Sequence, residues 1–360
     1  MDIRFENGIF GLIPKKAWLN VGFDVTRPDD PVDQLFGDIK TDNLVAMWES
    51  IAAEYSLPVM AQFHAFDAEA QKTMRFPVDV HNIEKGLIKV KIDQSERLRA
   101  LMGRGVQRES TLAEKVLNDG YKCADEVFTR SKVAKNELLA TGKITIKENN
   151  LDLTVDYGVP AANLALTLDV GAGATTPLDE QLLTITENAR AAGAPITGIY
   201  TSAAVLNTLR KNANIQKAIN GAAMVGQLVR NNDLRAYLND EYGIARILTN
   251  DLHYSLPLTM GSNGRPETHE KRFYPESKIT FFSANSKVGN GIWGDPPEVT
   301  AGKFNTAQTT AVSPSPYVYV DQYAEDDPKV VWTKASALFM PVLYNPNSLY
   351  VAAVTATPGA

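Results

Sequence analysis

The sequence contains a single cysteine, Cys123, in 360 residues. One cysteine excludes an internal disulfide and is typical of a protein from a reducing cytosol. No apolar run approaches the roughly 18 residues that a membrane-spanning helix requires, and the first residues lack the basic and then apolar pattern of a signal peptide. A net charge of −6 argues against tight, non-specific binding of nucleic acid as the main activity. We therefore expect an ordinary folded protein with no membrane segment.

Sequence patterns for catalysis and metal binding are also missing. The four histidines, scattered without the spacing of a zinc site, are His64, His81, His253 and His269. No G-x-S-x-G nucleophile elbow occurs, and Cys123 lies on an apolar stripe that favours a small buried side chain over a reactive thiol. Residues 289–294 (GNGIWG) fit G-x-G-x-x-G, but two prolines follow where a dinucleotide site needs a helix, so we interpret them as a loop. We predict no catalytic, cofactor-binding or metal-binding residue.

What the sequence does contain is one long helical pattern, from Thr111 to Thr141. Thr111 and Glu114 form a capping box, an apolar stripe runs along one face, and Gly142 is suited to end the helix. At about 1.5 Å per residue the helix would be roughly 45 Å long. Gly120 is its one weak interior point, and the alternative is a helix broken there into two ordinary ones. A rod of this length favours a flat, elongated subunit over a compact enzyme.

The rest of the chain divides into regions of different texture. Residues 1–45 are irregular, and we expect an arm there instead of a packed core. Leu57–Phe66 and Phe76–Ile92 resemble the two strands of a large hairpin. Lys143–Lys147 and Leu151–Tyr157 form a second hairpin after the long helix. From Leu164 strands alternate with short helices, and the last forty residues return to β character. The predicted class is α+β with at least two lobes, because 360 residues exceed a single core.

Four sequence segments, together with their order along the chain, resemble the lambda-type (E-family) major capsid proteins of tailed bacteriophages. They are residues 82–92 (NIEKGLIKVKI), 138–146 (LLATGKITI), 155–158 (VDYG) and 336–351 (SALFMPVLYNPNSLYV). The similarity runs over most of residues 35–356. It implies the Hong Kong 97 capsid fold and a structural subunit without catalysis, located in the virion and assembled in the host bacterial cytoplasm.

The resemblance also implies a division of the chain. The arm would be residues 1–45, the extended loop (E-loop) 46–95, the peripheral domain 96–165 with 327–360, and the α/β axial domain 166–326, with 111–141 as the spine helix of the peripheral domain. Pentamers and hexamers would form an icosahedral shell around double-stranded DNA, which the subunits contact loosely and without sequence preference. Expected partners are a separate scaffolding protein, a portal and a decoration protein. Lys72, near the expected tip of the loop, gives no basis for a covalent cross-link.

The E-loop contains large apolar residues that a two-stranded ribbon cannot bury against itself. These candidates for inter-subunit contact are Met60, Phe63, Phe66, Met74 and Phe76. A neighbouring subunit can cover them, and contacts of this kind that close on a rotation produce rings. The alternative is that they pack on the chain's own core. In a shell that matures by bending its subunits, Gly120 is where we expect the spine helix to flex.

Two other functions stay open at this point. One is an encapsulin-like nanocompartment shell, which has the same fold but would hold a protein cargo instead of DNA. The other is a cytosolic α/β enzyme with its site in residues 166–326. A stable small monomer or dimer with a ligand-filled pocket would favour the enzyme.

Overall fold

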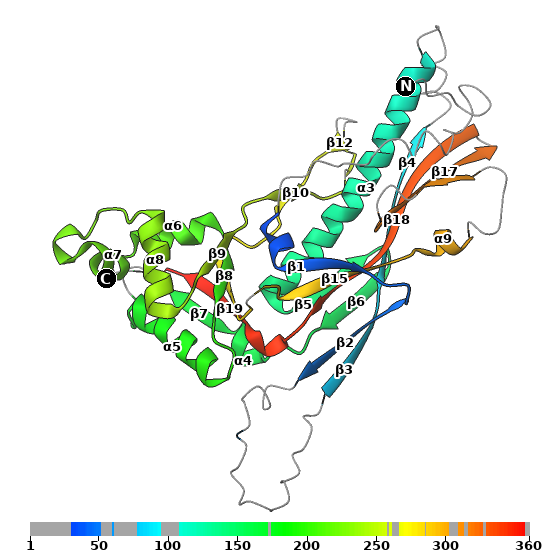
Figure 1. Ribbon diagram of the computed structural model, residues 1–360. Coiled ribbons are helices and arrows are strands. Elements are labelled where there is room, and N and C mark those ends of the chain that lie inside the picture. The colour runs from blue at the N-terminus through cyan, green and yellow to red at the C-terminus, as the bar shows by residue number, and fades with distance from the viewer. Residues whose placement is uncertain are drawn as a thin grey trace, which may run out of the picture.

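The computed structural model describes residues 30–51, 60, 78–94, 108–171, 174–257, 259–260, 266–284, 286–301, 309–312, 316–326 and 329–356. These residues form an elongated body around one long helix and, beside it, a smaller α/β lobe (Figure 1). The helices are α3 (Arg108–Thr141), α4 (Ala161–Leu164), α5 (Leu178–Ala191), α6 (Ala203–Lys211), α7 (Ala213–Asn220), α8 (Asn231–Tyr242) and α9 (Pro297–Ala301), with 3-10 turns η2 (Pro31–Gln34), η4 (Ala222–Met224) and η5 (Pro346–Ser348).

The described strands belong to two larger sheets and four two-stranded ones. They are β1 (Phe36–Lys40), β2 (Val45–Ile51), β3 (Val78–Glu84), β4 (Gly86–Gln94), β5 (Lys143–Glu148), β6 (Leu151–Asp156), β7 (Leu166–Asp169), β8 (Gly198–Thr201), β9 (Arg246–Thr249), β10 (His253–Ser255), β11 (Thr259–Met260), β12 (Pro266–Glu267), β13 (Glu270–Arg272), β14 (Lys278–Phe282), β15 (Gly289–Gly294), β16 (Thr309–Val312), β17 (Tyr319–Asp326), β18 (Lys329–Leu343) and β19 (Leu349–Thr355).

The long helix α3 is continuous through Gly120, which confirms the single helix and excludes the break there. It begins at Arg108, so the expected start at the Thr111 capping box is wrong. Arg and Glu are good helix formers, and three more residues extend the helix beyond that box. Gly142 ends it as expected, with a φ of +68° and its N–H donating to the Leu138 carbonyl at 2.8 Å.

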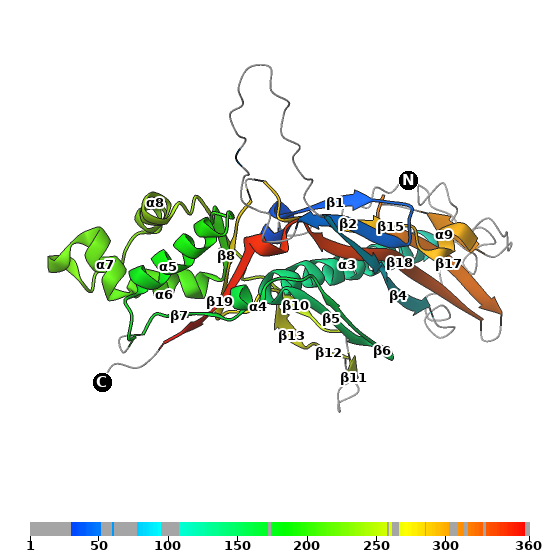
Figure 2. The ribbon, with the colours of Figure 1, turned by 90° about the horizontal axis from the view of Figure 1, so that it is seen from below.

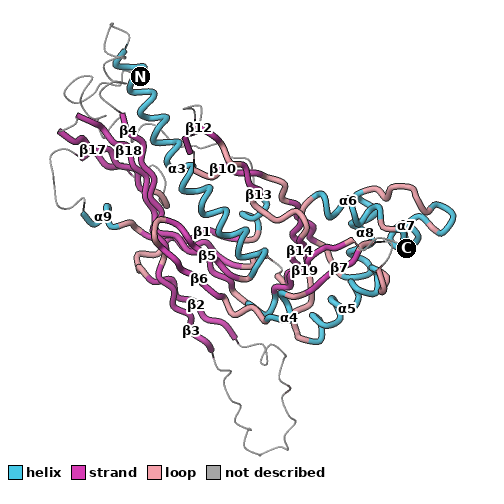
Figure 3. The backbone as a smooth tube through the Cα atoms, turned by 180° about the vertical axis from the view of Figure 1, so that it is seen from behind, coloured by secondary structure: helices cyan, strands magenta, loops and turns pink. Residues whose placement is uncertain are grey.

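The body is a sheet in the order β1-β15-β18-β17-β16, with β4 also paired to β18, and α3 packs on one face. Figure 2 and Figure 3 show α3 lying along β18, the longest described strand. Two fully buried alanines of β18, Ala335 and Ala337, let the helix approach closely. Trp293 of β15 packs between helix and sheet. Its ring centroid lies 5.3 Å from that of Phe128 on α3 and 4.5 Å from that of Phe339 on β18. The body therefore has one apolar core, shared by helix and sheet.

The lobe is a sheet in the order β7-β19-β14-β8-β9, with α5, α6, α7 and α8 packed around it. Its core is a second apolar cluster that includes Leu182, Leu238, Ile279 and Phe281. β19, near the end of the chain, pairs with β14 and β7, so the terminal strands link body and lobe. The alternation of strands and short helices that the sequence predicts from Leu164 onward is present here, with strands β8, β9 and β14 between the helices and loops.

The two expected hairpins have different outcomes. The second is confirmed as β5 and β6, whose turn residues Asn149 and Asn150 have φ values of +48° and +63°. The first pairs β2 with β3 at its base, from Val45 opposite Glu84 to Ile51 opposite Val78. The expected strand 57–66 lies outside the described residues except for Met60. The expected single strand 76–92 is wrong, because it divides at Lys85 into β3 and β4, which belong to different sheets.

Other expectations also need correction. The irregular arm predicted for residues 1–45 is wrong over 30–40, where η2 and β1 pack into the body with Val32 and Phe36 buried. Residues 289–294 form strand β15 and not a loop. The glycines suit this strand because a Cβ at Gly289 would lie 2.0 Å from the Val342 carbonyl oxygen, closer than any real contact.

The helices of the lobe begin in different ways. Pro177 holds the N-cap position of α5, and Asp233 lies in the first turn of α8. Ser202 caps α6, with the Val205 N–H donating to its hydroxyl at 3.2 Å.

Candidate functional site

The hairpin β2–β3 carries apolar side chains that are exposed to solvent. Leu44, just before β2, is half exposed, and Met47 on β2 is 59% exposed. Met60, one of the five predicted contact residues, is 84% exposed. The other four, Phe63, Phe66, Met74 and Phe76, lie outside the described residues. Among the described strands, β2 and β3 form a separate two-stranded sheet without a third strand beside them.

Lys85, between β3 and β4, fixes the direction in which this hairpin leaves the body. The residue is buried, with only 3% of its surface exposed. Its ammonium donates to the Thr41 hydroxyl and to the carbonyls of Thr41, Asn43 and Trp293, at 2.5–3.1 Å. Burial lowers the pKa of Lys85, while the nearby carboxylates of Asp42 and Asp295 act in the opposite direction. In the sequence Lys85 stands between Glu84 and Gly86, and nothing there indicated this role.

A second buried lysine ties α3 to the first described residues. The Lys135 ammonium lies 3.1 Å from Asp33 Oδ1 and 3.0 Å from Asp38 Oδ1. Asp38 also accepts from the Trp293 indole N–H at 2.9 Å. The charged groups are thus paired and hydrogen-bonded, as buried charges must be. The cluster holds η2 and β1 against the middle of the body.

A buried hydrogen-bonded network lies where body and lobe meet. The Asn250 amide donates to Asp30 Oδ1 at 3.1 Å, to Asn136 Oδ1 at 3.1 Å and to the Tyr200 hydroxyl at 2.7 Å. The Tyr200 hydroxyl in turn donates to Asn136 Oδ1 at 2.7 Å. Burial is the main cause that raises the pKa of Asp30, against the Val32 N–H and the ammonium groups of Lys132 and Lys135, which lower it. The network joins four parts of the chain that are far apart in sequence.

The C-terminal end of α3 is also held by the lobe. The last carbonyls of a helix lack partners within the helix. Here the Leu139 carbonyl accepts from the Thr280 hydroxyl at 2.8 Å, and the Ala140 carbonyl accepts from the Lys278 ammonium at 2.8 Å. Both donors are on β14. A cation at this end of a helix is also favoured by the helix dipole.

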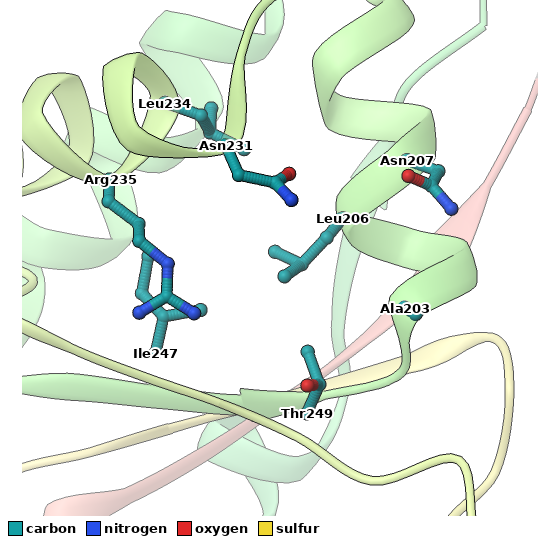
Figure 4. Close-up of a pocket in the computed structure, with 8 residues that line it drawn as sticks. All are labelled: Ala203, Leu206, Asn207, Asn231, Leu234, Arg235, Ile247 and Thr249. Atoms are coloured by element: carbon teal, nitrogen blue, oxygen red, sulfur yellow. The ribbon is translucent and has the colours of Figure 1, made fainter.

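The lobe contains a cavity of about 130 Å³ between α6, α8 and β9 (Figure 4). Leu206, Leu234 and Ile247 give it apolar walls, and Asn231 and Arg235 reach into it from α8. None of the described residues lining it is acidic, a histidine or a cysteine. Its described lining therefore holds no carboxylate or imidazole to act as a general base, and Thr249 supplies the one hydroxyl without such a base beside it in the lining.

The remaining predicted residues fit a structural role. Cys123 is fully buried on α3, and burial raises the pKa of its thiol to about 12. The described residues contain no group of three or more potential metal ligands. No described helix is long and apolar enough to cross a membrane. Gly120 lies buried within α3, and its predicted flexing is not tested by a single conformation.

Sequence reasoning missed an exposed apolar segment at the far end of the lobe. After α7, Met224, Val225 and Leu228 are each about half exposed, and residues 221–228 are exposed throughout. They hold no charged residue. The run of small and apolar residues without a charge could have indicated this exposed segment.

The chain resembles solved capsid structures. The putative capsid protein of a prophage of E. coli CFT073 is 13% identical, with 94% of this chain and 97% of that chain covered and a TM-score of 0.52. A cyanophage A-1(L) capsid subunit is 13% identical, with 93% and 96% covered and a TM-score of 0.46. A chain of the satellite phage P4 procapsid is 10% identical, with 91% of this chain and 95% of that chain covered and a TM-score of 0.45. No curated protein matches the chain.

The similarity to the prophage protein shows the fold, which is α+β and Hong Kong 97-like. The model of the family described as phage major capsid protein E matches residues 88–354. That range contains α3, the whole lobe and the terminal strands. The chain therefore belongs to the phage major capsid protein E family, as a structural and non-enzymatic subunit that assembles with copies of itself into the capsid shell of the virion.

Proposed function

We propose that the subunit forms pentamers and hexamers, which together build an icosahedral shell around double-stranded phage DNA. The elongated outline supports this, because α3 runs along the body and the lobe narrows toward α7 (Figure 1). Subunits of this shape can meet at their narrow ends, and heterologous contacts that close on a rotation give rings. In this proposal the axial domain lies within residues 166–326 and is formed by the lobe from β7 to β14, while β15, β16 and β17 of that range pair in the body sheet with β18. Residues 96–165 with 327–360 form the peripheral domain.

The exposed apolar ribbon β2–β3 is the observation that carries the proposal. A hairpin of two strands is marginal in water by itself, and side chains such as Met47 and Met60 remain uncovered. Residues 46–95 would act as the E-loop, and a neighbouring copy would cover its apolar side chains. We extend this role to Phe63, Phe66, Met74 and Phe76. The expected N-terminal arm is then confined to residues before Asp30.

Replacing Phe66 and Phe76 by Ser, or deleting Asp67–Thr73, tests the E-loop contact. The variant subunit should remain folded, with an unchanged circular dichroism spectrum, and should fail to form shells in electron micrographs. The matched control changes both phenylalanines to Leu, which keeps the apolar surface and should still assemble. Normal shells from the Ser variant would show that the loop is not an assembly contact.

Gly120 is proposed as the flexing point of the spine helix. Glycine in a helix interior is less favourable than alanine by about 1 kcal/mol, so bending is easiest there. Comparing all copies of the subunit within one shell by electron microscopy tests this. A straight α3 through Gly120 in every copy would contradict it.

The partners proposed from the resemblance are a separate scaffolding protein, a portal and a decoration protein. The net charge of −6 supports only loose contact with packaged DNA. Purified particles distinguish this function from the encapsulin-like alternative: double-stranded DNA inside supports the phage shell, and a protein cargo without DNA supports the nanocompartment. Particle diameter and symmetry in the same micrographs test the pentamers and hexamers.

A further inference from the structure

The lobe has two flanks, at opposite edges of its sheet. In the order β7-β19-β14-β8-β9, strands β7 and β9 are the two edge strands. α5 packs against β7, whereas α6 and α8 enclose the cavity beside β9. Figure 1 shows α5 along the lower side of the lobe and α6 along the upper side. In a ring of identical subunits, one flank of each copy faces the other flank of the next.

The α5 flank is apolar in the middle and acidic around it. Glu180, Leu183 and Glu187 are spaced by three and four residues, so they share one face of the helix. All three are exposed, and Leu183 is 42% exposed. Arg190 follows in the last turn, where a cation suits the helix dipole. The flank therefore presents one leucine between two carboxylates.

The opposite flank presents a complementary surface. The cavity of about 130 Å³ has apolar walls from Leu206, Leu234 and Ile247. A cavity of about 150 Å³ with such a lining can hold benzene, so one leucine side chain is a suitable occupant. Arg235 and Asn231 stand at the cavity and supply hydrogen-bond donors (Figure 4). No carboxylate lies among the described lining residues; Asp251, which accepts from the N–H of the lining residue Ala203 at 3.1 Å, is paired with Arg272.

We propose that α5 of one copy docks on the cavity of the next copy in the ring. Leu183 enters between Leu206 and Leu234, and Glu187 faces Arg235 across the contact. The contact is heterologous, since two different flanks meet, and it repeats around the ring until the ring closes. The inference rests on the proposed rings and names the surfaces that form them. The partner is a second copy of this chain.

Cysteine cross-linking tests the contact in assembled particles. Leu183→Cys and Asn231→Cys are combined in one chain, and particles are treated with a mild oxidant. Cys123 is fully buried, so the introduced thiols react selectively. We expect a ladder of covalent oligomers that ends at rings on a non-reducing gel, because neighbouring thiols come within disulfide range. Each single variant should stay monomeric on the gel.

The matched control pairs Leu183→Cys with Asn239→Cys, an exposed position two turns further along α8. At about 1.5 Å per residue it lies roughly 12 Å from position 231, beyond disulfide reach. A ladder from this control equal to that of the test pair would overturn the proposed geometry. Particles that form without any ladder in the test pair would overturn the flank contact while leaving the proposed function intact. Wild-type protein that forms no shell would instead overturn the proposed function.

A charge exchange tests the polar part of the contact. Arg235→Glu or Glu187→Arg alone should lower the yield of particles about tenfold, since repulsion replaces attraction at every contact of the ring. The double variant should recover most of the wild-type yield. Thermal melts of the unassembled subunit check that each variant folds. Single variants with wild-type yield, or a double variant no better than either single one, would contradict the pairing of Glu187 with Arg235.

Discussion

The body around α3 and the α/β lobe bury their interiors in different ways. The described buried charged side chains, Asp30, Lys85, Lys135 and Asp321, all lie in the body or at its border with the lobe. The core of the lobe is apolar, with short strands and helices that follow one another along the chain. In the body, segments from residue 36 to residue 343 meet in one sheet. Where distant segments must find one register, paired charges and hydrogen bonds can specify it, which we state as a hypothesis.

The largest expected effect comes from truncating one core residue in each region. Trp293→Ala in the body and Phe281→Ala in the lobe should each lower the free energy of unfolding by about 3–5 kcal/mol. Both side chains are fully buried. If the two cores are separate cooperative units, calorimetry of the unassembled subunit should show two transitions, and each variant should lower a different one. A single transition that both variants lower equally would break the comparison.

The second prediction concerns the buried lysine of the body. Lys85→Met removes the side-chain donor from the Thr41 and Asn43 carbonyls, whereas the Trp293 carbonyl keeps the Thr41 N–H as a donor at 2.9 Å. We expect a loss of about 2–3 kcal/mol in urea unfolding, because buried acceptors without partners are costly. The control is Lys89→Met on β4, the strand that follows Lys85; the half-exposed Lys89 ammonium pairs with Glu298 at 2.7 Å and should contribute less than about 1 kcal/mol. Equal losses would show that burial does not distinguish these lysines.

Asp30→Asn should have a smaller effect that depends on pH. Burial raises the pKa of Asp30, so the folded state binds the proton more tightly than the unfolded state. Its favourable contribution is present below the unfolded pKa of about 3.8 and is lost as the pH rises through the folded pKa. At pH 7 the Asn variant should therefore be more stable, by about 1 kcal/mol.

That difference should shrink as the pH falls toward 4. Urea unfolding of both proteins across this range measures it. The control is Asp152→Asn on the exposed β5–β6 hairpin. Its free energy of unfolding should stay close to that of the wild type over the whole pH range. A gap that widens toward acid would reverse the sign expected from burial.

The smallest effect is expected for the exposed ion pair between Lys147 and Asp152. Their charged atoms are 3.6 Å apart, and both side chains are about two-thirds exposed. Lys147→Ala should change the free energy of unfolding by at most about 0.5 kcal/mol, and the change should vanish in high salt. A loss comparable to that of Lys85→Met would show that exposed pairs also stabilise the body.

Local patterns predicted the elements whose cause is local. The helix from residue 111 to 141, the Asn149–Asn150 turn and the terminal strands follow from periodicity, glycine and turn residues, and they are present. The division of the strand at Lys85 could not be predicted, because the carbonyls that bind this lysine come from residues far away in sequence. For the same reason β15 was taken for a loop: its glycines are explained by the closeness of Val342. The burial of Asp30 could not be predicted either, because its partner Asn250 is 220 residues away in sequence.

The candidate site was only partly predictable. Met60 was identified from its size and its place in a ribbon, and it is exposed. The cavity beside Arg235 and the acidic face of α5 required the three-dimensional order of the strands, since sequence shows neither edge of a sheet. Four of the five predicted contact residues lie outside the described part of the chain, so their contact stays a prediction.

The attachment of Lys278 and Thr280 to the last carbonyls of α3 has a mechanical consequence. These bonds make the helix a lever whose short end is fixed in the lobe. With 34 residues at about 1.5 Å each, the lever is about 51 Å long and the body sheet is packed along it, so a tilt of about 5° at the lobe displaces the far end of helix and sheet together by roughly 4 Å. Small rotations of the lobe are thereby amplified at the opposite end of the subunit.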